Sequence, residues 1–403
     1  MINFDIRSFI NTNITGRSKS FFENDIINNR GILTNEIAGS NILVIGGGGT
    51  IGSNYIKSIL PFKPAKVVVV DTNENGLTEL VRSVRSTPGL FVPKEFITYP
   101  VNLADSIFEK LYNYYKPFDI IANFAAHKHV RSEKDVFSIE AMIGNNLFNA
   151  YRLLRLIEED EPKHFFCVST DKAANPVNIM GATKKLMEEL VIDFSKYLRC
   201  TTARFANVAF SNGSLLDGFI YRTMQRQPLA VPADIKRYFV SPAESGDICM
   251  LASILGNSGD IFFPKLTEDQ LTSFLDITTR FVEEMGYEME VCSSEEEAKE
   301  KSLLIGETKK YPVYVFNSDT TGEKLFEEFS TEDEVVDWSR YEALAVAKAK
   351  NASRYNDSSQ VISELQAIFN GKTPLKSDIV KILSMHIPNF AHIEKGITLD
   401  NKM

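Results

Sequence analysis

The sequence is poor in the features that mark secreted, membrane-spanning and nucleic-acid-binding proteins. Asp5 and Arg7 interrupt the N-terminus before a secretory signal could form, and no apolar run reaches the roughly 18 residues that cross a bilayer. Basic residues are outnumbered, 44 against 53 acidic ones, so the net charge of -9 opposes bulk attraction to nucleic acid or anionic lipid. These absences predict a cytoplasmic protein with no membrane span and no nucleic-acid partner.

Cysteine and histidine are also scarce, with four and five copies among 403 residues. The cysteines lie far apart, and their spacing suits neither zinc nor a disulfide framework. His127 and His129 flank a lysine, but two histidines two residues apart on a loop make a poor metal pair. We therefore expect no metal site, and four reduced thiols at Cys167, Cys200, Cys249 and Cys292.

What the sequence does contain is a regular alternation of short apolar runs and segments of helical period. The apolar runs lie at 41–45, 66–70, 95–101, 119–124 and 164–168, and the helical segments at 53–60, 74–86, 105–115, 138–158 and 181–198. Buried strands that alternate with helices are typical of a parallel sheet with helices on both faces. The pattern predicts an α/β fold with a doubly wound parallel sheet of the Rossmann type.

Changes in composition and in the pattern of expected elements divide the chain into four parts. Residues 1–39 are polar and Asn-rich, with no obvious core, and form an N-terminal extension. Residues 40–205 form the Rossmann domain, and 206–330, where proline-containing loops interrupt short elements, form a smaller α/β substrate domain. Residues 331–403 are expected to be a C-terminal helical extension, with helices at 331–352, 357–369 and 375–386.

A glycine-rich loop follows the first apolar run and precedes a helix. Gly46 permits a tight turn, Gly49 lets the backbone approach a pyrophosphate, and Gly52 allows close packing of helix and sheet. The helix N-terminus then offers N–H groups to phosphate oxygens. Without the flanking pattern, such a run would be only a flexible turn. The predicted dinucleotide contacts in this loop are Gly46, Gly49, Thr50, Ile51 and Gly52.

Asp71 ends the second apolar run, 19 residues after Gly52. A carboxylate at this place can accept hydrogen bonds from both ribose hydroxyls of the adenosine. The same carboxylate would repel a 2′-phosphate, so Asp71 favours NAD over NADP.

The spacing of the glycines by three resembles the extended branch of the short-chain dehydrogenase/reductase superfamily. That superfamily implies a Ser or Thr at a strand end and a Tyr-x-x-x-Lys motif on the next helix. Here residues 169–172 read Ser-Thr-Asp-Lys and residues 180–184 read Met-Gly-Ala-Thr-Lys, so the lysine is present and methionine replaces the tyrosine. One interpretation is a non-catalytic NAD-binding protein that has lost its phenol.

The other interpretation is a more specific resemblance. Thr170-Asp171-Lys172-Ala173, with Pro176 and Asn178, is similar to the nucleotide-sugar 4,6-dehydratases of bacterial capsule and glycoprotein-glycan synthesis. Configuration-retaining members of that family carry methionine at the place of Met180. Further matching segments lie at 15–17, 125–130, 145–146, 204–208, 211–214, 237–239 and 321–325, and Arg131, Asn102 and Thr320 depart from the family's pattern.

The resemblance implies a role for each matched residue. Thr170 would hydrogen-bond the O4 atom of the sugar, Asp171 would serve as acid toward the C6 hydroxyl, and Lys172 would be the C5 base, although the last two roles could be exchanged. Lys184 would complete the catalytic set and contact the nicotinamide ribose. Further cofactor contacts are Asn102, Leu103, Ala125 and Ala126, and the substrate contacts are Lys128, His129, Met180, Asn207, Ser214 and Arg237. Taken alone, Arg237 could equally be a surface salt-bridge residue.

The function that the resemblance implies is NAD-dependent 4,6-dehydration of a nucleotide sugar, with UDP-N-acetylglucosamine as the leading substrate and a GDP sugar as the nearest variant. The reaction forms the 4-keto-6-deoxy sugar and recycles its NAD. A homo-oligomer is expected. Two alternatives stay open: a nucleotide-sugar 4-epimerase, and a non-catalytic NAD-dependent sensor, which only Met180 supports.

Overall fold

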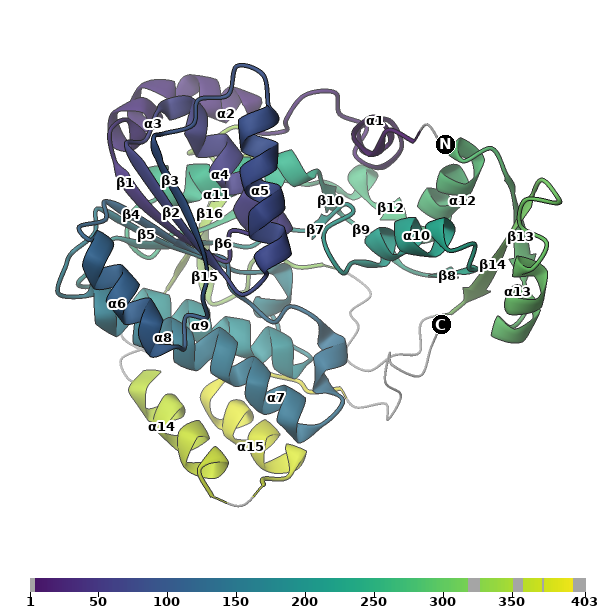
Figure 1. Ribbon diagram of the computed structural model, residues 1–403. Coiled ribbons are helices and arrows are strands. Elements are labelled where there is room, and N and C mark those ends of the chain that lie inside the picture. Colours follow the sequence, from purple (N-terminus) through teal and green to yellow (C-terminus); the bar gives the residue numbers. More distant parts are fainter. Residues whose placement is uncertain (1–3, 318–326, 351–357, 372, 394–403) are drawn as a thin grey trace.

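The computed structural model describes residues 4–317, 327–350, 358–371 and 373–393, and a nine-stranded sheet runs through its larger lobe (Figure 1). Its strands are β1 (Asn41–Ile45), β2 (Lys66–Asp71), β3 (Glu95–Pro100), β4 (Ile120–Asn123), β5 (His164–Val168), β6 (Cys200–Ala203), β11 (Ile261–Pro264), β15 (Glu334–Asp337) and β16 (Leu344–Ala349). They are ordered β15-β16-β11-β6-β5-β4-β1-β2-β3. Because β1 pairs in parallel with both β2 and β4, the winding reverses between β1 and β4. The predicted doubly wound parallel sheet is confirmed.

Helices cover both faces of this sheet because its strands are apolar on both sides. In β1, Ile42 and Val44 point to one face while Leu43 and Ile45 point to the other, and all four are buried. The first face is covered by α4 (Thr50–Ile59), α5 (Glu74–Ser86) and α11 (Pro242–Leu255). The second is covered by α6 (Ser106–Tyr115), α7 (Val136–Ile143), α8 (Asn149–Ile157) and α9 (Ile179–Phe194).

A smaller lobe lies beyond the carboxyl ends of the strands (Figure 1). It contains a parallel sheet of β13 (Glu288–Cys292), β14 (Lys310–Phe316) and β8 (Leu229–Pro232), with helices α10 (Leu215–Met224), α12 (Phe274–Glu284) and α13 (Glu295–Ser302). Two short ladders lie between the lobes: β7 (Asn207–Val208) with β10 (Phe239–Val240), and β9 (Lys236–Arg237) with β12 (Thr272–Ser273). Phe219, Phe281 and Tyr311 are buried in the core of this lobe.

The N-terminal extension has a core role, contrary to the prediction that residues 1–39 carry none. Its helices are α1 (Ile6–Phe9), α2 (Glu23–Asn28) and α3 (Arg30–Ile37). Phe9 packs into the core of the smaller lobe, whereas Leu33 and Ile37 pack into the core beneath the large sheet. The segment bridges the two lobes, so its apolar residues serve two different cores and show no single period along the chain.

The helix expected over 331–352 is wrong, because β15 and β16 form an antiparallel pair at the edge of the large sheet there. Alanines favour a helix in isolation. Here Ala345 and Ala347 lie opposite Phe263 and Ile261 of β11, and that pairing overrides the local preference. Likewise α11 and β11, which fall within 206–330, belong to the large sheet rather than to the smaller lobe.

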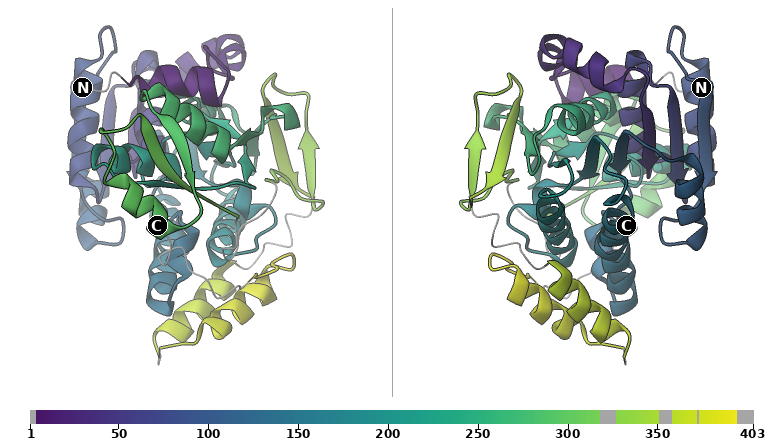
Figure 2. Two further views of the ribbon diagram at one scale, coloured as in Figure 1. Left: turned by 90° about the vertical axis from the view of Figure 1, so that its right-hand side faces the viewer. Right: turned by 90° about the vertical axis from the view of Figure 1, so that its left-hand side faces the viewer.

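The last two helices agree with the sequence-based prediction. α14 (Ser358–Phe369) and α15 (Lys376–His386) pack against each other and against α9. Figure 2 shows them as a yellow pair at one end of the molecule, well away from the green smaller lobe. Val361, Leu365 and Leu383 add their side chains to the core on the second face of the sheet.

Candidate active site

The glycine loop between β1 and α4 is shaped by close backbone approaches. Gly46 has φ +78°, and a Cβ there would lie 2.6 Å from the backbone nitrogen of Ala125. A Cβ on Gly52 would lie 2.4 Å from the carbonyl oxygen of Gly46. A Cβ on Gly49 would meet only that oxygen, at 3.6 Å, so the surface of the loop at Gly49 is open. The first and third glycines are therefore required by packing, while the second leaves room for a ligand.

Asp71 lies at the end of β2, against this loop. Its Oδ2 accepts a hydrogen bond from Gly48 N and its Oδ1 one from Asn73 N, both at 2.8 Å. Each carboxylate oxygen keeps a second lone pair for a hydroxyl donor. Gly76, in the first turn of α5, was not singled out in the sequence, yet a Cβ there would lie 2.5 Å from the carbonyl oxygen of Gly48. A glycine inside a helical pattern was the available signal.

The other expected cofactor residues lie at the carboxyl ends of β1, β3 and β4. Asn102 is exposed and its Oδ1 accepts from Ala104 N at 2.9 Å, while the neighbouring Leu103 is buried. Ala125 N donates to Asn123 Oδ1 at 3.1 Å. The hydroxyl of Thr50 accepts a hydrogen bond from Asn212 N at 2.9 Å, so this residue ties the loop to the smaller lobe.

A cleft of about 700 Å³ opens between the large sheet and the smaller lobe. It brings together most of the residues that the sequence assigned to catalysis and substrate binding: Lys128, His129, Thr170, Asp171, Lys172, Met180, Lys184, Asn207 and Ser214. Two of the expected cofactor contacts, Ile51 and Ala126, line it as well. Arg237 does not line it. That side chain is buried, with its Nη1 donating to the carbonyl oxygen of Lys236 at 2.9 Å. Thr320 and the motif at 321–325 lie outside the described residues.

Thr170, Asp171 and Lys172 form a continuous polar cluster where β5 ends. The Thr170 hydroxyl donates to Asp171 Oδ1 at 2.7 Å, and Lys172 Nζ lies 3.2 and 3.3 Å from the two Asp171 oxygens. Asp171 is buried, whereas 30% of the surface of the Lys172 side chain is exposed. One carboxylate thus contacts both a hydroxyl and an ammonium, an arrangement that can pass protons between them.

Lys184 lies one turn along α9 from Met180 and is almost fully buried. Its Nζ donates to the carbonyl oxygen of Val168 at 2.8 Å, and burial lowers the pKa of this lysine. The start of α9 lies directly on the turn that carries Asp171 and Lys172, since a Cβ on Gly181 would be 2.5 Å from the Lys172 carbonyl oxygen. Met180 N donates to Glu133 Oε1 at 3.0 Å.

The loop after β4 also lines the cleft. Asn146 holds this loop through two bonds with the backbone of His127, and its Nδ2 also donates to the Thr183 hydroxyl at 3.1 Å. Lys128 Nζ lies 3.5 Å from Ser211 Oγ. Burial lowers the pKa of both Lys128 and His129, and for His129 the positive charge of Lys128 lowers it further.

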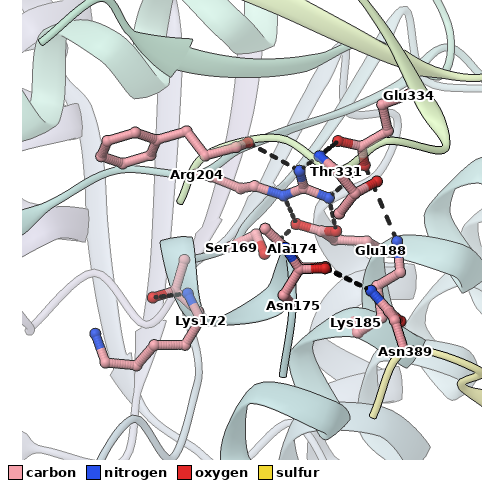
Figure 3. Close-up of polar contacts among 12 residues, drawn as sticks. Ser169, Lys172, Ala174, Asn175, Lys185, Glu188, Arg204, Thr331, Glu334 and Asn389 are labelled. Atoms are coloured by element: carbon pink, nitrogen blue, oxygen red, sulfur yellow. Dashed lines mark hydrogen bonds and ion pairs between the residues drawn. The ribbon is translucent and has the colours of Figure 1, made fainter. Parts of the chain in front are cut away.

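A buried arginine anchors helix α9 (Figure 3). Arg204 binds Glu188 of α9 through two hydrogen bonds of 2.6 and 2.8 Å, and Glu334 of β15 through two of 2.7 and 2.9 Å. Glu188 also accepts from the Ser169 hydroxyl at 2.5 Å. The sequence offered Arg204 only as part of a matching motif, with no partner, because Glu334 is 130 residues away.

The end of the described chain supports the loop that follows Lys172. Asn389 Nδ2 donates to the carbonyl oxygen of Ala174 at 3.0 Å, and Ala391 N donates to that of Pro176 at 3.1 Å (Figure 3 shows Asn389 beside Ala174 and Asn175). No local pattern in the sequence could have indicated these contacts, since the partners are more than 200 residues apart.

Comparison with known proteins defines the family. The chain belongs to the polysaccharide biosynthesis protein family, which it matches over residues 42–349. It is 27% identical to an uncharacterised membrane protein of Methanocaldococcus jannaschii, over 87% of this chain and 98% of the relative. It is 27% identical to the capsular polysaccharide biosynthesis protein CapD of Staphylococcus aureus, over 78% of this chain, and spans 49% of that protein's length. Within the described ranges no helix is long and apolar enough to cross a membrane.

Relatives with a named reaction are of two kinds. The inverting UDP-N-acetylglucosamine 4,6-dehydratase of Campylobacter jejuni is 27% identical over 58% of this chain and 70% of its own. The UDP-glucose 4-epimerase of Rickettsia bellii is 29% identical over 56% of this chain and 65% of its own. Both kinds therefore resemble this chain to the same degree.

Solved structures agree with the fold. Pen of Bacillus thuringiensis superimposes with a TM-score of 0.63 at 19% identity, covering 84% of this chain and 99% of Pen. DesIV, the dTDP-glucose 4,6-dehydratase of Streptomyces venezuelae, gives a TM-score of 0.51 at 18% identity, covering 72% of this chain and 88% of DesIV.

Proposed function

We propose that this protein is an NAD-dependent nucleotide-sugar 4,6-dehydratase that acts on a UDP-N-acetylhexosamine, with UDP-N-acetylglucosamine as the first substrate to test. The observation that carries the proposal is the Thr170–Asp171–Lys172 cluster, which opens into one cleft together with Met180 and Lys184. The similarity to the inverting UDP-N-acetylglucosamine 4,6-dehydratase of Campylobacter jejuni supports the proposal.

The residues present fit NAD. The open surface at Gly49, the N-terminus of α4 and the Asp71 carboxylate line up along the carboxyl ends of β1 and β2, where a dinucleotide binds in such sheets. NAD, when bound, supplies the acceptor for a hydride from C4 of the sugar and the donor that returns it to C6. Lys184, held by the Val168 carbonyl, lies beside the catalytic turn and is suited to bind the nicotinamide ribose.

The smaller lobe offers a place for the diphosphate of the substrate. Ser214 caps α10 by accepting from Asp217 N at 3.2 Å, and residues of the first turn of this helix line the cleft. The N-terminus of a ten-residue helix favours a negatively charged group. Lys128 lines the cleft as well and would add a positive charge.

The cluster can move each proton that the reaction requires. Thr170 would hydrogen-bond O4, and Asp171 would take the O4 proton as the 4-ketone forms. Lys172 would remove the C5 proton, which the ketone acidifies, while Asp171 returns its proton to the departing C6 hydroxyl to release water. Lys172 would then give its proton back to C5. Met180 has no acidic hydrogen, so Asp171 replaces a phenol in this scheme.

Two alternatives remain distinct from this proposal. A 4-epimerase returns the hydride to C4 and needs neither a base at C5 nor an acid at C6, so it leaves Lys172 without a role. A non-catalytic sensor rests on Met180 alone.

One incubation separates the three. Purified protein is mixed with a panel of UDP, dTDP and GDP sugars without added NAD, and the products are weighed by mass spectrometry. We expect loss of one water from a UDP-N-acetylhexosamine. An isomer of unchanged mass would establish an epimerase, and no conversion across the panel would favour the sensor.

A further inference from the structure

Glu327 is a buried carboxyl group that no step above uses. Its side chain is only 2% exposed. Its Oε1 accepts from Asn207 Nδ2 at 2.5 Å and its Oε2 accepts from Tyr238 N at 2.8 Å, so it bridges the two strand segments that enter the smaller lobe. Asn207 lines the cleft, and thus Glu327 lies directly behind a residue of its wall.

Charged and titratable groups on two segments of the chain, residues 171–172 and 237–238, act on Glu327. The charges of Asp171 and Lys172 shift the pKa of Glu327, and Arg237 Nε lies 4.0 Å from its Oε1. Burial raises the pKa of the Tyr238 phenol, and the negative charge of Glu327 contributes to the rise. Burial and, after it, the negative charge of Asp171 raise the pKa of Glu327 to about 7, although Lys172, the Tyr238 N–H and Arg237 act in the opposite direction. Glu327 therefore changes charge within the physiological range.

A second buried carboxylate, Glu334, shows that burial alone does not leave a glutamate with a raised pKa. Glu334 is also removed from water, but Arg204 binds both of its oxygens. Although burial raises the pKa of Glu334, Arg204 and then Lys185 lower it below its ordinary value. Glu327 has no such bidentate partner among the contacts described above, and it faces a second carboxylate instead.

We propose that Glu327 is a positioning residue of the catalytic centre whose charge sets the protonation of the Asp171–Lys172 pair. When Glu327 carries a proton, Lys172 faces a single carboxylate, that of Asp171. When Glu327 ionises, a second negative charge lies behind the pair and favours the ammonium form of Lys172, which cannot accept the C5 proton. The effect on catalysis rests on the proposed dehydratase mechanism. The electrostatic coupling between Glu327 and the Asp171–Lys172 pair does not depend on that mechanism.

The coupling can be measured without turnover. Infrared difference spectra of the NAD-loaded protein, from about pH 5 to about pH 9, should show a protonated carboxyl band with a midpoint near 7. We expect Glu327→Gln to remove this band and Glu328→Gln to keep it, since Glu328 is exposed and accepts a hydrogen bond from Asn175.

Two further variants test the assignment even if Glu327→Gln fails to fold. Removing the positive charge in Lys172→Met should move the Glu327 midpoint to higher pH, and removing the negative charge in Asp171→Asn should move it to lower pH. A band that survives Glu327→Gln, or midpoints that neither variant moves, would overturn the inference.

The consequence for catalysis is measured as the pH profile of kcat. The substrate is the nucleotide sugar that the incubation described above shows to be converted. We expect wild type and Glu328→Gln to share an ionisation near pH 7 that Glu327→Gln lacks. A merely structural role would lower kcat equally at every pH, and that result would overturn the inference. If the wild type converts no nucleotide sugar while the band and its shifts behave as expected, the dehydratase proposal fails and the Glu327 coupling stands.

Discussion

Two clusters of buried charge adjoin the same catalytic turn and behave differently. In the Arg204 cluster (Glu188, Arg204 and Glu334), both carboxylates are bound bidentately and the arginine is fully buried. In the Lys172 cluster (Asp171, Lys172 and Glu327), two carboxylates face one partly exposed lysine. Similar residue types thus serve opposite purposes: complete pairing fixes helix α9 in place, whereas incomplete pairing leaves protons that can move.

Arg204→Met should have the largest effect on stability. It would leave Glu188 and Glu334 buried without their counter-charge, at a cost of about 3–5 kcal/mol in the free energy of unfolding. Chemical denaturation measures this directly. The matched control is Arg155→Met, which breaks an exposed pair with Glu158 and should cost no more than about 1 kcal/mol. A loss in Arg204→Met as small as in the control would show that the Arg204 cluster is not structural.

The same cluster should respond to acid. Because the folded protein holds the pKa of Glu334 below its ordinary value, the stability from this ion pair is present at neutral pH and is lost as the pH falls through the folded pKa. Arg204→Met should therefore lose less stability than wild type between neutral and acidic pH.

Lys172→Met and Asp171→Asn should have the largest effect on activity and little on stability. General acid–base groups contribute about 10²–10⁴-fold each, so kcat should fall by that factor while the bound NAD content stays unchanged. Lys196→Met is the control, since this exposed lysine forms an ion pair with Asp193, three residues away on the surface. Near-wild-type turnover in Asp171→Asn would remove that residue from the mechanism.

Asp71→Asn tests a carboxylate that belongs to neither cluster. Its oxygens accept hydrogen bonds from backbone N–H groups and can each accept one more from a ligand. Replacing the charged acceptor should weaken NAD binding by about 1.5–3 kcal/mol. The NAD that remains after dialysis is measured, with Asp276→Asn, an exposed residue of α12 in the smaller lobe, as control. An unchanged NAD content would contradict the role of Asp71.

Met180→Ala should have the smallest effect on turnover, because methionine offers packing and a weak sulfur acceptor but no proton. We expect a decrease in kcat of less than about 10-fold, with Met180→Leu closer still to wild type. If Met180→Ala lowers kcat as much as Lys172→Met while thermal unfolding shows an intact fold, the roles assigned to Met180 and Lys172 are wrong.

Much of the larger lobe could be predicted from the sequence. The β-branched runs that became β1, β2 and β5 and the helical periods between them are local signals, and each stood within a few residues of its observed place. The alanine-rich strand β16 could not be predicted, because its conformation depends on pairing with β11, 80 residues earlier.

The candidate site divides in the same way. Thr170, Asp171, Lys172 and Lys184 lie within fifteen residues of one another, and a motif is enough to bring them together. Glu327 and Glu334 lie 120 and 130 residues from the partners that they bind, and each is an ordinary glutamate in its own stretch of sequence. Their roles became visible only through their partners, Asn207 and Arg204.

Residue order along the chain was sufficient for the alternation of strands and helices, for the glycine loop and for the strand end that carries Thr170, because neighbours in sequence are neighbours in space there. Whether a buried carboxyl group is fully paired or free to titrate is a different matter. Glu334 and Glu327 differ by seven positions, yet one meets a bidentate arginine and the other a second carboxylate. That outcome depends on distances between distant segments, which only folding brings about.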